Sequence, residues 1–476
     1  MGFVRGVHRD QVVMFPESLD EYITDDNPVR FIDAFVDSLN LQALGFKRVV
    51  AMERGRPPYH PGDLLKLYIY GYLNRVRTSR TLEREAQRNV EVMWLLGKLA
   101  PDFKTIADFR RDNGKPIRRV FREFTVMCRK MELFGGQLVA IDGSKFKAVN
   151  SRDRNYTERK LKRLKKRADE KITRYLEELE EADEQEQDNE RPTAKELQEK
   201  IEWLKGRKEV YADLQERMDE SGESQVSLTD ADARSMKLGN SRGTEVAYNV
   251  QISVDAKHKL IVDHEVTNAG NDKEQLSSMA IRAKETLEVQ ALDVVADQGY
   301  YSSKEIKTCI DGDISPYLRK PKDSNSRSLF ARKEFRYDGD ADCYWCPAGK
   351  AMPFRYQTTY RGQVVRDYIG EECGQCALRS KCTRSKTGRK IRRWVEEELL
   401  EDMARRVRAE PDKVKQRKSI VEHPFGTIKR SMDQGYFLTR GLPGVRTEAS
   451  LTMLAYNIKR AVNLQGVQQL IAALPS

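Results

Sequence analysis

The sequence predicts a mixed α/β fold with a helical N-terminal part and two insertions. Two short apolar segments that run into aspartates are typical of buried strands. A third segment, Thr244 to Asp263, alternates apolar and polar residues around a turn at Asp255 to His258, as a β-hairpin does. Amphipathic segments with helical spacing alternate with these strands. This order of elements predicts one mixed α/β sheet.

The two apolar segments each carry one carboxylate. The segment from Gln137 to Ala148 contains Asp142, and the segment from Ala291 to Ser302 contains Asp297. Because each aspartate closes the apolar run, we expect it at the C-terminal end of a buried strand. A carboxylate in that place is costly unless a cation neutralises it. A single Asp of this kind is also a common turn residue, so the hypothesis of a metal site rests on a third acid, Glu422, in a segment that is typical of a helix start.

Residues 1–130 are expected to form an N-terminal helical domain. Its last part is interpreted as two short helices joined by a turn around residues 100–104, the second of them begun by Thr105 and carrying Arg110 and Arg111. Two readings stay open. The pair is either a helix-turn-helix that binds DNA in the major groove or an ordinary helical hairpin with a solvated basic face.

Residues 153–220 are dominated by Lys, Arg, Glu and Gln, with two stripes of apolar residues at spacings of three and four. This pattern predicts an inserted antiparallel helical hairpin or coiled coil. Thr193 and Glu196 are expected to cap its second helix. The basic start of the first helix, Lys160 to Arg167, either follows a DNA backbone or is a solvated face.

Five cysteines lie close together in the sequence. Cys343 and Cys346 precede Cys373, Cys376 and Cys382, and the two C-x-x-C pairs resemble a zinc ribbon. Five cysteines compete for four ligand places, and we favour the last four, with Cys343 as the possible substitute. The alternative is a loop with unpaired cysteines.

Composition limits the class of partner. Among 476 residues, 85 Lys and Arg exceed 74 Asp and Glu, which gives a net charge of +11 and favours a polyanion such as nucleic acid. No apolar run approaches the roughly 20 residues that a membrane span needs, and the N-terminus lacks the apolar core of a secretory signal. We therefore expect a cytoplasmic, nucleoid-associated protein with no membrane partner.

Several segments together resemble the DDE insertion-sequence transposases, which have a ribonuclease H-like catalytic domain. They are GRPPYHPGDLLKLYIYGYLN, similar to the InsH-type N-terminal domain, and then VAIDGSKFKA, AYNVQISVD, VVADQGYYS and IVEHPFGTIKR, in matching order. The resemblance implies that Asp142, Asp297 and Glu422 are the catalytic acids. It also implies two Mg²⁺ or Mn²⁺ ions bound by these three carboxylates.

Related enzymes have a Tyr, Arg, Glu, Lys pattern around the third acid, and this chain follows it only in part. Glu422 and Lys429 match, whereas Lys418 stands at the Arg position and Lys415 at the Tyr position. The resemblance implies that Lys429, with Lys418 and Arg430, lies near DNA phosphates. A solvated helix lysine is the alternative for Lys429.

The resemblance implies an enzyme with DNA endonuclease and strand-transferase activity. It would cut the ends of an insertion sequence and join the 3′-hydroxyls to target DNA by two-metal phosphoryl transfer, as a homodimer on double-stranded DNA that includes the terminal inverted repeats. An inactive DNA-binding derivative and a metal-dependent nuclease that does not join strands stay open. The expected domains are 1–130 (helical, DNA-binding), 131–152 with 221–335 and 395–465 (ribonuclease H-like), 153–220 (helical hairpin) and 336–394 (cysteine-rich).

Overall fold

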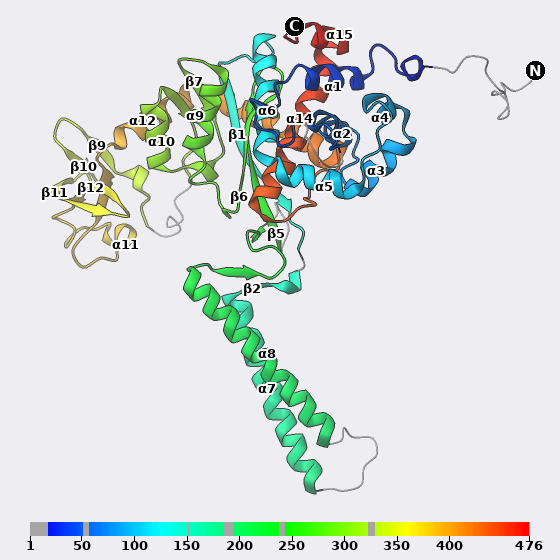
Figure 1. The fold of residues 1–476 in the computed structure, drawn as a ribbon. Coiled ribbons are helices and arrows are strands. Elements are labelled where there is room, and N and C mark those ends of the chain that lie inside the picture. The colour runs from blue at the N-terminus through cyan, green and yellow to red at the C-terminus, as the bar shows by residue number, and fades with distance from the viewer. Residues whose placement is uncertain are drawn as a thin grey trace, which may run out of the picture. The chain divides into compact units, whose positions relative to one another are not determined.

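The computed structural model describes residues 18–50, 57–150, 152–184, 194–237, 243–321 and 329–475 (Figure 1). These residues form two compact units. The first unit contains Met1–Gly135, Gly143–Gly270 and Glu422–Ser476, and the second contains Gly136–Asp142 and Asn271–Val421. In the described part of the chain, no helix is both long and apolar enough to cross a membrane.

The N-terminal residues are helical, as predicted. Their helices are α1 (Pro28–Asp37), α2 (Pro61–Leu73), α3 (Ser79–Arg88), α4 (Val90–Leu95), α5 (Phe103–Asp112) and α6 (Gly114–Lys130), with a 3-10 turn at Leu19–Tyr22. Three helices, α3 to α5, stand where two were expected. Thr105 does not begin α5, because Asp102 is its N-cap and accepts hydrogen bonds from the backbone N–H groups of Lys104 and Thr105 at 3.0 Å.

The predicted mixed sheet is present. Its strands are β1 (Leu138–Lys147), β4 (Arg234–Lys237), β5 (Thr244–Asp255), β6 (Ile261–Thr267), β7 (Leu292–Val295) and β8 (Ile314–Tyr317), in the order β4-β5-β1-β7-β8 with β6 also paired to β5. The pairs β1 with β7 and β7 with β8 are parallel, whereas β5 pairs antiparallel with β4 and β6. The β5–β6 hairpin confirms the alternating pattern read from the sequence.

Helices follow and precede these strands as the alternating pattern predicted. They are α9 (Leu276–Leu287), α10 (Ser303–Asp311), α12 (Glu397–Ala409), α13 (Pro411–Gly426), α14 (Gly441–Gln465) and α15 (Val467–Ala472), with 3-10 turns at Arg152–Arg154, Gln298–Tyr300 and Arg332–Glu334. A π-helical turn, Thr427–Ser431, continues α13. Glu422 therefore lies near the end of a helix, and the expectation that it lies at a helix start was wrong.

The cysteine-rich segment contains a second sheet of order β13-β12-β11-β10-β9. Its elements are β9 (Arg336–Asp338), β10 (Cys343–Trp345), β11 (Ala351–Tyr360), β12 (Gln363–Ile369), the short helix α11 (Arg379–Cys382) and β13 (Lys390–Trp394). A small core packs on one face of this sheet and consists of Phe335, Tyr344, Met352, Tyr368, Cys382 and Ile391.

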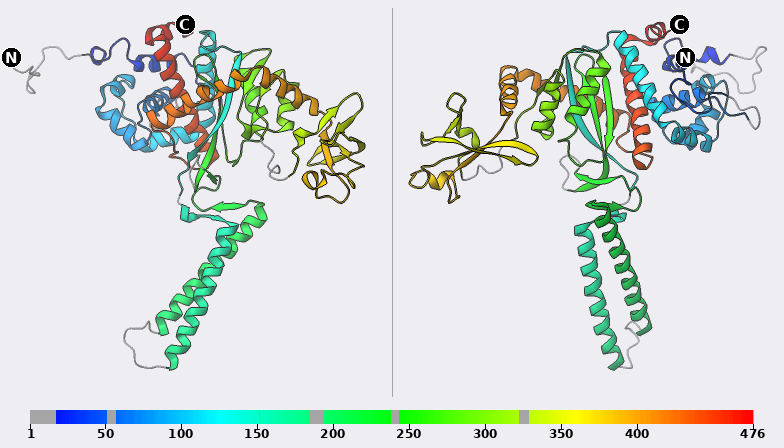
Figure 2. Two further views of the ribbon diagram at one scale, coloured as in Figure 1. Left: turned by 180° about the vertical axis from the view of Figure 1, so that it is seen from behind. Right: turned by 60° about the vertical axis from the view of Figure 1, so that its left-hand side comes forward.

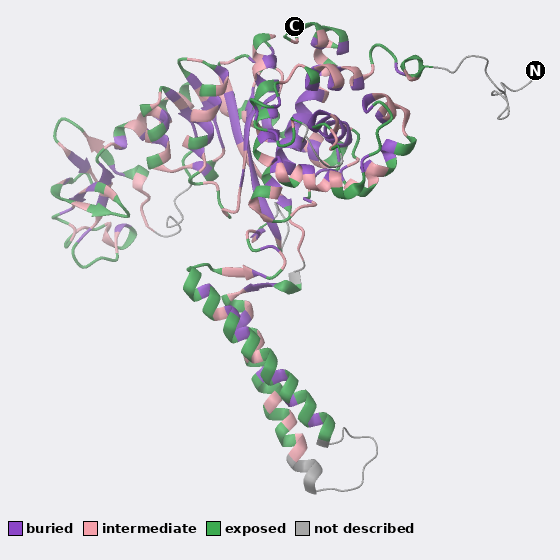
Figure 3. Cartoon of the chain, in the orientation of Figure 1, coloured by how far each residue is buried: buried purple, intermediate pink, exposed green. Residues whose placement is uncertain are grey.

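Two long helices, α7 (Glu158–Glu184) and α8 (Ala194–Ser221), run side by side and antiparallel (Figure 2). At their base, β2 (Asn155–Thr157) pairs antiparallel with β3 (Gln225–Ser227). Buried positions recur among exposed ones along both helices (Figure 3). The buried positions include Leu161, Ala168, Leu197, Ile201, Leu204, Tyr211, Leu214 and Met218. Thr193, the expected cap of the second helix, lies outside the described residues.

Candidate active site

Asp142 lies on β1, and Asp297 lies just beyond the end of the neighbouring parallel strand, β7. The register of β1 on β7 pairs Leu138 with Asp293 and Ala140 with Val295, an offset of 293 − 138 = 155 residues. The same offset separates the two candidate acids, since 297 − 142 = 155. Continued two residues past the last paired position, this register would place Asp142 of β1 opposite Asp297, which lies just beyond the end of β7.

Asp142 lies in the middle of a strand and not at its end. β1 continues to Lys147, five residues past the aspartate, so the predicted strand end was wrong. The carboxylate is half-buried, and the Nη1 of Arg417 lies 2.9 Å from its Oδ2. The guanidinium thus neutralises the charge that the apolar surroundings of β1 would otherwise make costly.

Asp297 lies just beyond the end of β7, as predicted. It is the N-cap of the 3-10 turn Gln298–Tyr300, and its Oδ1 accepts a hydrogen bond from the backbone N–H of Gly299 at 2.6 Å. A Cβ atom on Gly299 would lie 2.8 Å from this same oxygen, so the residue must be glycine for the carboxylate to keep its place. Tyr300, which is buried, anchors the turn beneath it.

Helix α13 is tied to the two strands by successive cations. Lys413, one helical turn before Arg417, donates to Asp293 Oδ2 on β7 at 2.7 Å and to the Tyr317 hydroxyl on β8 at 3.2 Å. Burial works against the charged lysine, but hydrogen bonds to Asp293 and Glu410 outweigh it and raise the pKa of Lys413. Lys413 therefore stays protonated and fixes the helix against the sheet.

Glu422 lies in the first unit, five residues after Arg417 along the same helix, and its side chain is exposed. The next residue, His423, shares a 2.8 Å hydrogen bond with the Tyr456 hydroxyl. Burial, together with Arg460 and Lys259, lowers the pKa of His423, so this imidazole is neutral at pH 7. Within the described ranges, no three or more Asp, Glu, His or Cys side chains already stand together as a metal-binding group.

Lys429 is anchored to β1 rather than directed to solvent. From the π-helical turn, its Nζ donates to Ser144 Oγ at 2.6 Å and to the Lys145 carbonyl at 2.8 Å, and it lies 4.7 Å from the centre of the Phe146 ring. Two other candidate phosphate contacts, Lys418 and Arg430, have exposed side chains. They remain predictions.

The two arginines of α5 differ in environment. Arg110 lies over the ring of Tyr68, 5.6 Å from its centre, in the interior of the helical bundle. Arg111 is exposed and is held by Asp108 and Asp112. Arg111 is thus the more exposed of the two, and DNA contact by either arginine remains a prediction.

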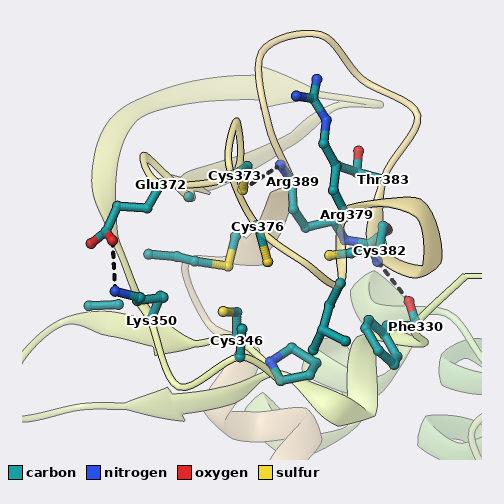
Figure 4. Close-up of a pocket in the computed structure, with 16 residues that line it drawn as sticks. Phe330, Cys346, Lys350, Glu372, Cys373, Cys376, Arg379, Cys382, Thr383 and Arg389 are labelled. Carbon is teal, nitrogen blue, oxygen red and sulfur yellow. Dashed lines mark hydrogen bonds and ion pairs between the residues drawn. The ribbon is translucent and has the colours of Figure 1, made fainter.

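Four of the five clustered cysteines line one pocket. They are Cys346, Cys373, Cys376 and Cys382, the four that the sequence analysis favoured, and Cys343 is not among the lining residues (Figure 4). All seven cysteines of the chain are free thiols in the structure.

The sequence analysis missed Arg417 and Lys413. Arg417 precedes by one residue the Lys418 that stands at the Arg position of the pattern. The positive charge beside Asp142 could have been found by examining the cations that shortly precede Glu422 in the sequence. Its partner was not recoverable from spacing alone, because 275 residues separate Arg417 from Asp142.

Two family models match the chain. One, described as a transposase domain (DUF772), matches residues 17–112, and the other, described as a transposase DDE domain, matches residues 345–462. The chain is therefore similar to transposases in these two segments. The two matches support a DDE-type transposase, for which dependence on divalent metal is general. Glu422 and Lys429 fall inside the second match, whereas Asp142 and Asp297 lie outside both.

A solved structure also shows similarity. It is a cryo-EM structure of the piggyBac transposase synaptic complex with hairpin DNA, at 10% identity, covering 94% of this chain and 79% of that chain, with a TM-score of 0.33. At this TM-score we draw no inference from it. A search of curated proteins finds no match.

Proposed function

We propose that this transposase cuts DNA at the ends of an insertion sequence and joins the freed 3′-hydroxyls to target DNA. The observation that supports the proposal most is the register of β1 on β7, whose offset of 155 residues equals the separation of Asp142 and Asp297 in the sequence. Two carboxylates at one edge of a sheet are suited to hard divalent cations. Glu422, from the helix that also carries Arg417, is proposed as the third ligand.

The two aspartates fit a Mg²⁺ or Mn²⁺ site in their chemistry, since both offer carboxylate oxygens. A pair of such ions, when bound, supplies an activated oxygen nucleophile and stabilises the leaving oxygen of the phosphodiester. Arg417 Nη1 lies 2.9 Å from Asp142 Oδ2. We propose that this ion pair keeps the carboxylate in position for a divalent cation.

The chain's own cations are proposed to position DNA. Lys429 is held against β1 by Ser144 and Lys145, so its charge is fixed in place before any phosphate arrives. Lys418 and Arg430, both exposed, would add phosphate contacts along the same segment. Arg111 of α5 would contribute a contact from the N-terminal helices. With a net charge of +11, binding should weaken steeply with salt.

Double-stranded DNA, both the terminal inverted repeats and the target, is the proposed partner. Two element ends must be joined in one reaction sequence, so we propose a homodimer on DNA. A protein of this kind would work with the nucleoid in the cytoplasm.

The proposal is tested by incubating purified chain and Mg²⁺ with the DNA that flanks its own reading frame, and by following cleavage and strand transfer. Asp142→Ala, Asp297→Ala and Glu422→Ala are expected to abolish both reactions while DNA binding is kept. Asp311→Ala, an exposed acid of α10 in the second unit, is the matched control and should react like the wild type. Full activity in any of the three variants would remove that residue from the site.

The same assay separates the remaining alternatives. Cutting without joining would identify a nuclease. Binding without cutting, in Mg²⁺ and in Mn²⁺, would identify an inactive DNA-binding derivative.

A further inference from the structure

The segment between β12 and β13 lacks a core of its own. Residues 370–389 contain one short helix, α11, and in this stretch only Gly370, Cys382 and Gly388 are buried. A stretch of this length with so little regular structure is uncommon in a compact domain unless something holds it together. The segment is held in place by a few hydrogen bonds, such as the one from the backbone N–H of Phe330, which precedes β9, to the Lys381 carbonyl at 2.8 Å.

Four thiols meet at this segment. Cys346 comes from the turn that follows β10, where its N–H donates to the Lys350 carbonyl at 2.9 Å. Cys373 and Cys376 come from the start of the irregular segment, and Cys382 ends α11. Figure 4 shows their sulfur atoms on the walls of one pocket, which is otherwise largely apolar and includes Leu378.

The backbone around Cys373 is packed so closely that side chains are excluded. A Cβ atom on Gly370 would lie 2.7 Å from Cys373 Sγ, and one on Gly388 would lie 3.3 Å from it and 2.7 Å from the Gly370 carbonyl oxygen. Gly388 also has φ of +94°, a conformation that favours glycine. The backbone N–H of Arg389 approaches the same sulfur at 3.4 Å. Such N–H groups stabilise a thiolate, which is the form that binds metal.

Cys343 does not belong to this group. It lies on β10, opposite Asp338 of β9 and Pro353 of β11, and it is buried in the sheet. Cys343 lies three residues before Cys346 and carries the same thiol group. Its replacement therefore serves as the control that tests whether the position of a cysteine decides zinc binding.

We propose that Cys346, Cys373, Cys376 and Cys382 bind one structural Zn²⁺ and that Cys343 does not. Four thiolates at zinc distance have sulfurs about 3.8 Å apart, from a Zn–S distance of about 2.3 Å. The thiols do not yet stand as such a set, so binding requires their side chains to turn into the pocket that they line. The ion then supplies the crosslink that the irregular segment lacks.

The test measures metal in the full-length chain, purified under reducing conditions, by elemental analysis. Wild type and Cys343→Ser are expected to carry about one zinc per chain, and Cys376→Ser and Cys382→Ser to carry at most a small fraction of that. A wild type with fully reduced thiols and no zinc, or with iron in its place, would overturn the proposal. So would zinc retained in Cys376→Ser or lost in Cys343→Ser.

A second measurement guards against variants that do not fold. Wild-type chain stripped by a chelator is titrated with Co²⁺, which is expected to give the visible absorption of a tetrahedral thiolate site and to be displaced by Zn²⁺. Absence of that absorption, with the far-UV spectrum still native, would refute the site. Neither readout depends on DNA cleavage, so the zinc proposal and the proposed function fail separately.

Discussion

Replacing Glu448 by Ala should destabilise the first unit strongly. This carboxylate of α14 is fully buried, accepts hydrogen bonds from the backbone N–H groups of Leu438 and Thr439 at 2.9 to 3.0 Å, and lies 3.4 Å from Nη1 of Arg77, which is 5% exposed. Removing one partner of a buried pair costs roughly 3–5 kcal/mol. Arg77 keeps a 2.9 Å bond to the Tyr436 carbonyl, which places the expected loss near the lower end, about 3 kcal/mol.

The assay is thermal unfolding of the full chain, with all variants scanned at one rate. At roughly 2–4 °C per kcal/mol for a large domain, Glu448→Ala should lower the Tm by about 6–12 °C. Glu448→Gln keeps an acceptor oxygen and should lose less. Glu209→Ala, at an exposed position of α8, is the control and should stay within about 1–2 °C of wild type. A Glu448→Ala variant as stable as that control would refute the reasoning.

Four further changes test other parts of the structure. Arg417→Gln removes the cation beside Asp142 and should lower the Mg²⁺ concentration for half-maximal cleavage by roughly tenfold, the effect of a charge about 5 Å from the ion in a water-like medium. Arg405→Gln, on the exposed side of α12, is the control and should leave this Mg²⁺ concentration unchanged. An equal effect of both substitutions would contradict the proposed metal site. Gly299→Ala should cut cleavage by roughly tenfold or more, about 1.4 kcal/mol, with little change in Tm, because the new Cβ would displace the Asp297 carboxylate; a fully active variant would show that this carboxylate position is not needed. Arg118 and Arg446 outweigh burial and lower the pKa of Glu265, so its stabilising contribution should be present above its ordinary value of 4.5 and be lost as the pH falls further. The Tm difference between wild type and Glu265→Gln should accordingly shrink below about pH 4.5. A Tm difference that is constant from pH 7 to pH 3 would show that the charge of Glu265 does not stabilise the fold. Leu214→Ala, in the buried stripe of α8, should cost about 2–3 kcal/mol and speed proteolysis within α7 and α8, whereas unchanged protection would mean that this stripe does not hold the helices together.

The spacing of apolar residues correctly predicted those helices and strands that are determined by residues close together in the sequence. The alternation of β5 and β6, the apolar run of β7 and the apolar spacing of α7 and α8 are all properties of neighbouring residues, and each predicted element is present. The placement of Asp297 after a strand followed in the same way, because the apolar run and the turn residue Gly299 are adjacent to it.

The end of β1 was missed because its cause lies far along the chain. The continuous apolar run stops at Asp142, yet the N–H of Lys147 donates to the Gly435 carbonyl at 3.2 Å and its carbonyl accepts from the N–H of Phe437 at 2.9 Å. Phe146 also stacks on Phe437, with ring centres 5.6 Å apart. These partners extend the strand past Asp142, and they lie almost 300 residues away.

The start of α13 was misplaced for a different reason. The segment around Glu422 was interpreted from the sequence alone as the start of a helix. The helix begins at Pro411, since proline at the first position of a helix lacks only an N–H that would be unpaired there. Recognising that start would have brought Lys413 and Arg417 onto the helix, although their partners on β7 and β1 depend on how the helix packs.

The helix pair α7 and α8 has a consequence for engineering this chain. Each helix is about 40 Å long, from 27 and 28 residues at 1.5 Å per residue, and the pair is closed at its base by the β2–β3 ladder. Equal numbers of turns could therefore be deleted from the far ends of both helices without touching that ladder. The length of the α7–α8 helix pair can therefore be varied. A series of chains with shortened helices would measure the length at which any contact made by the far end of the pair is lost.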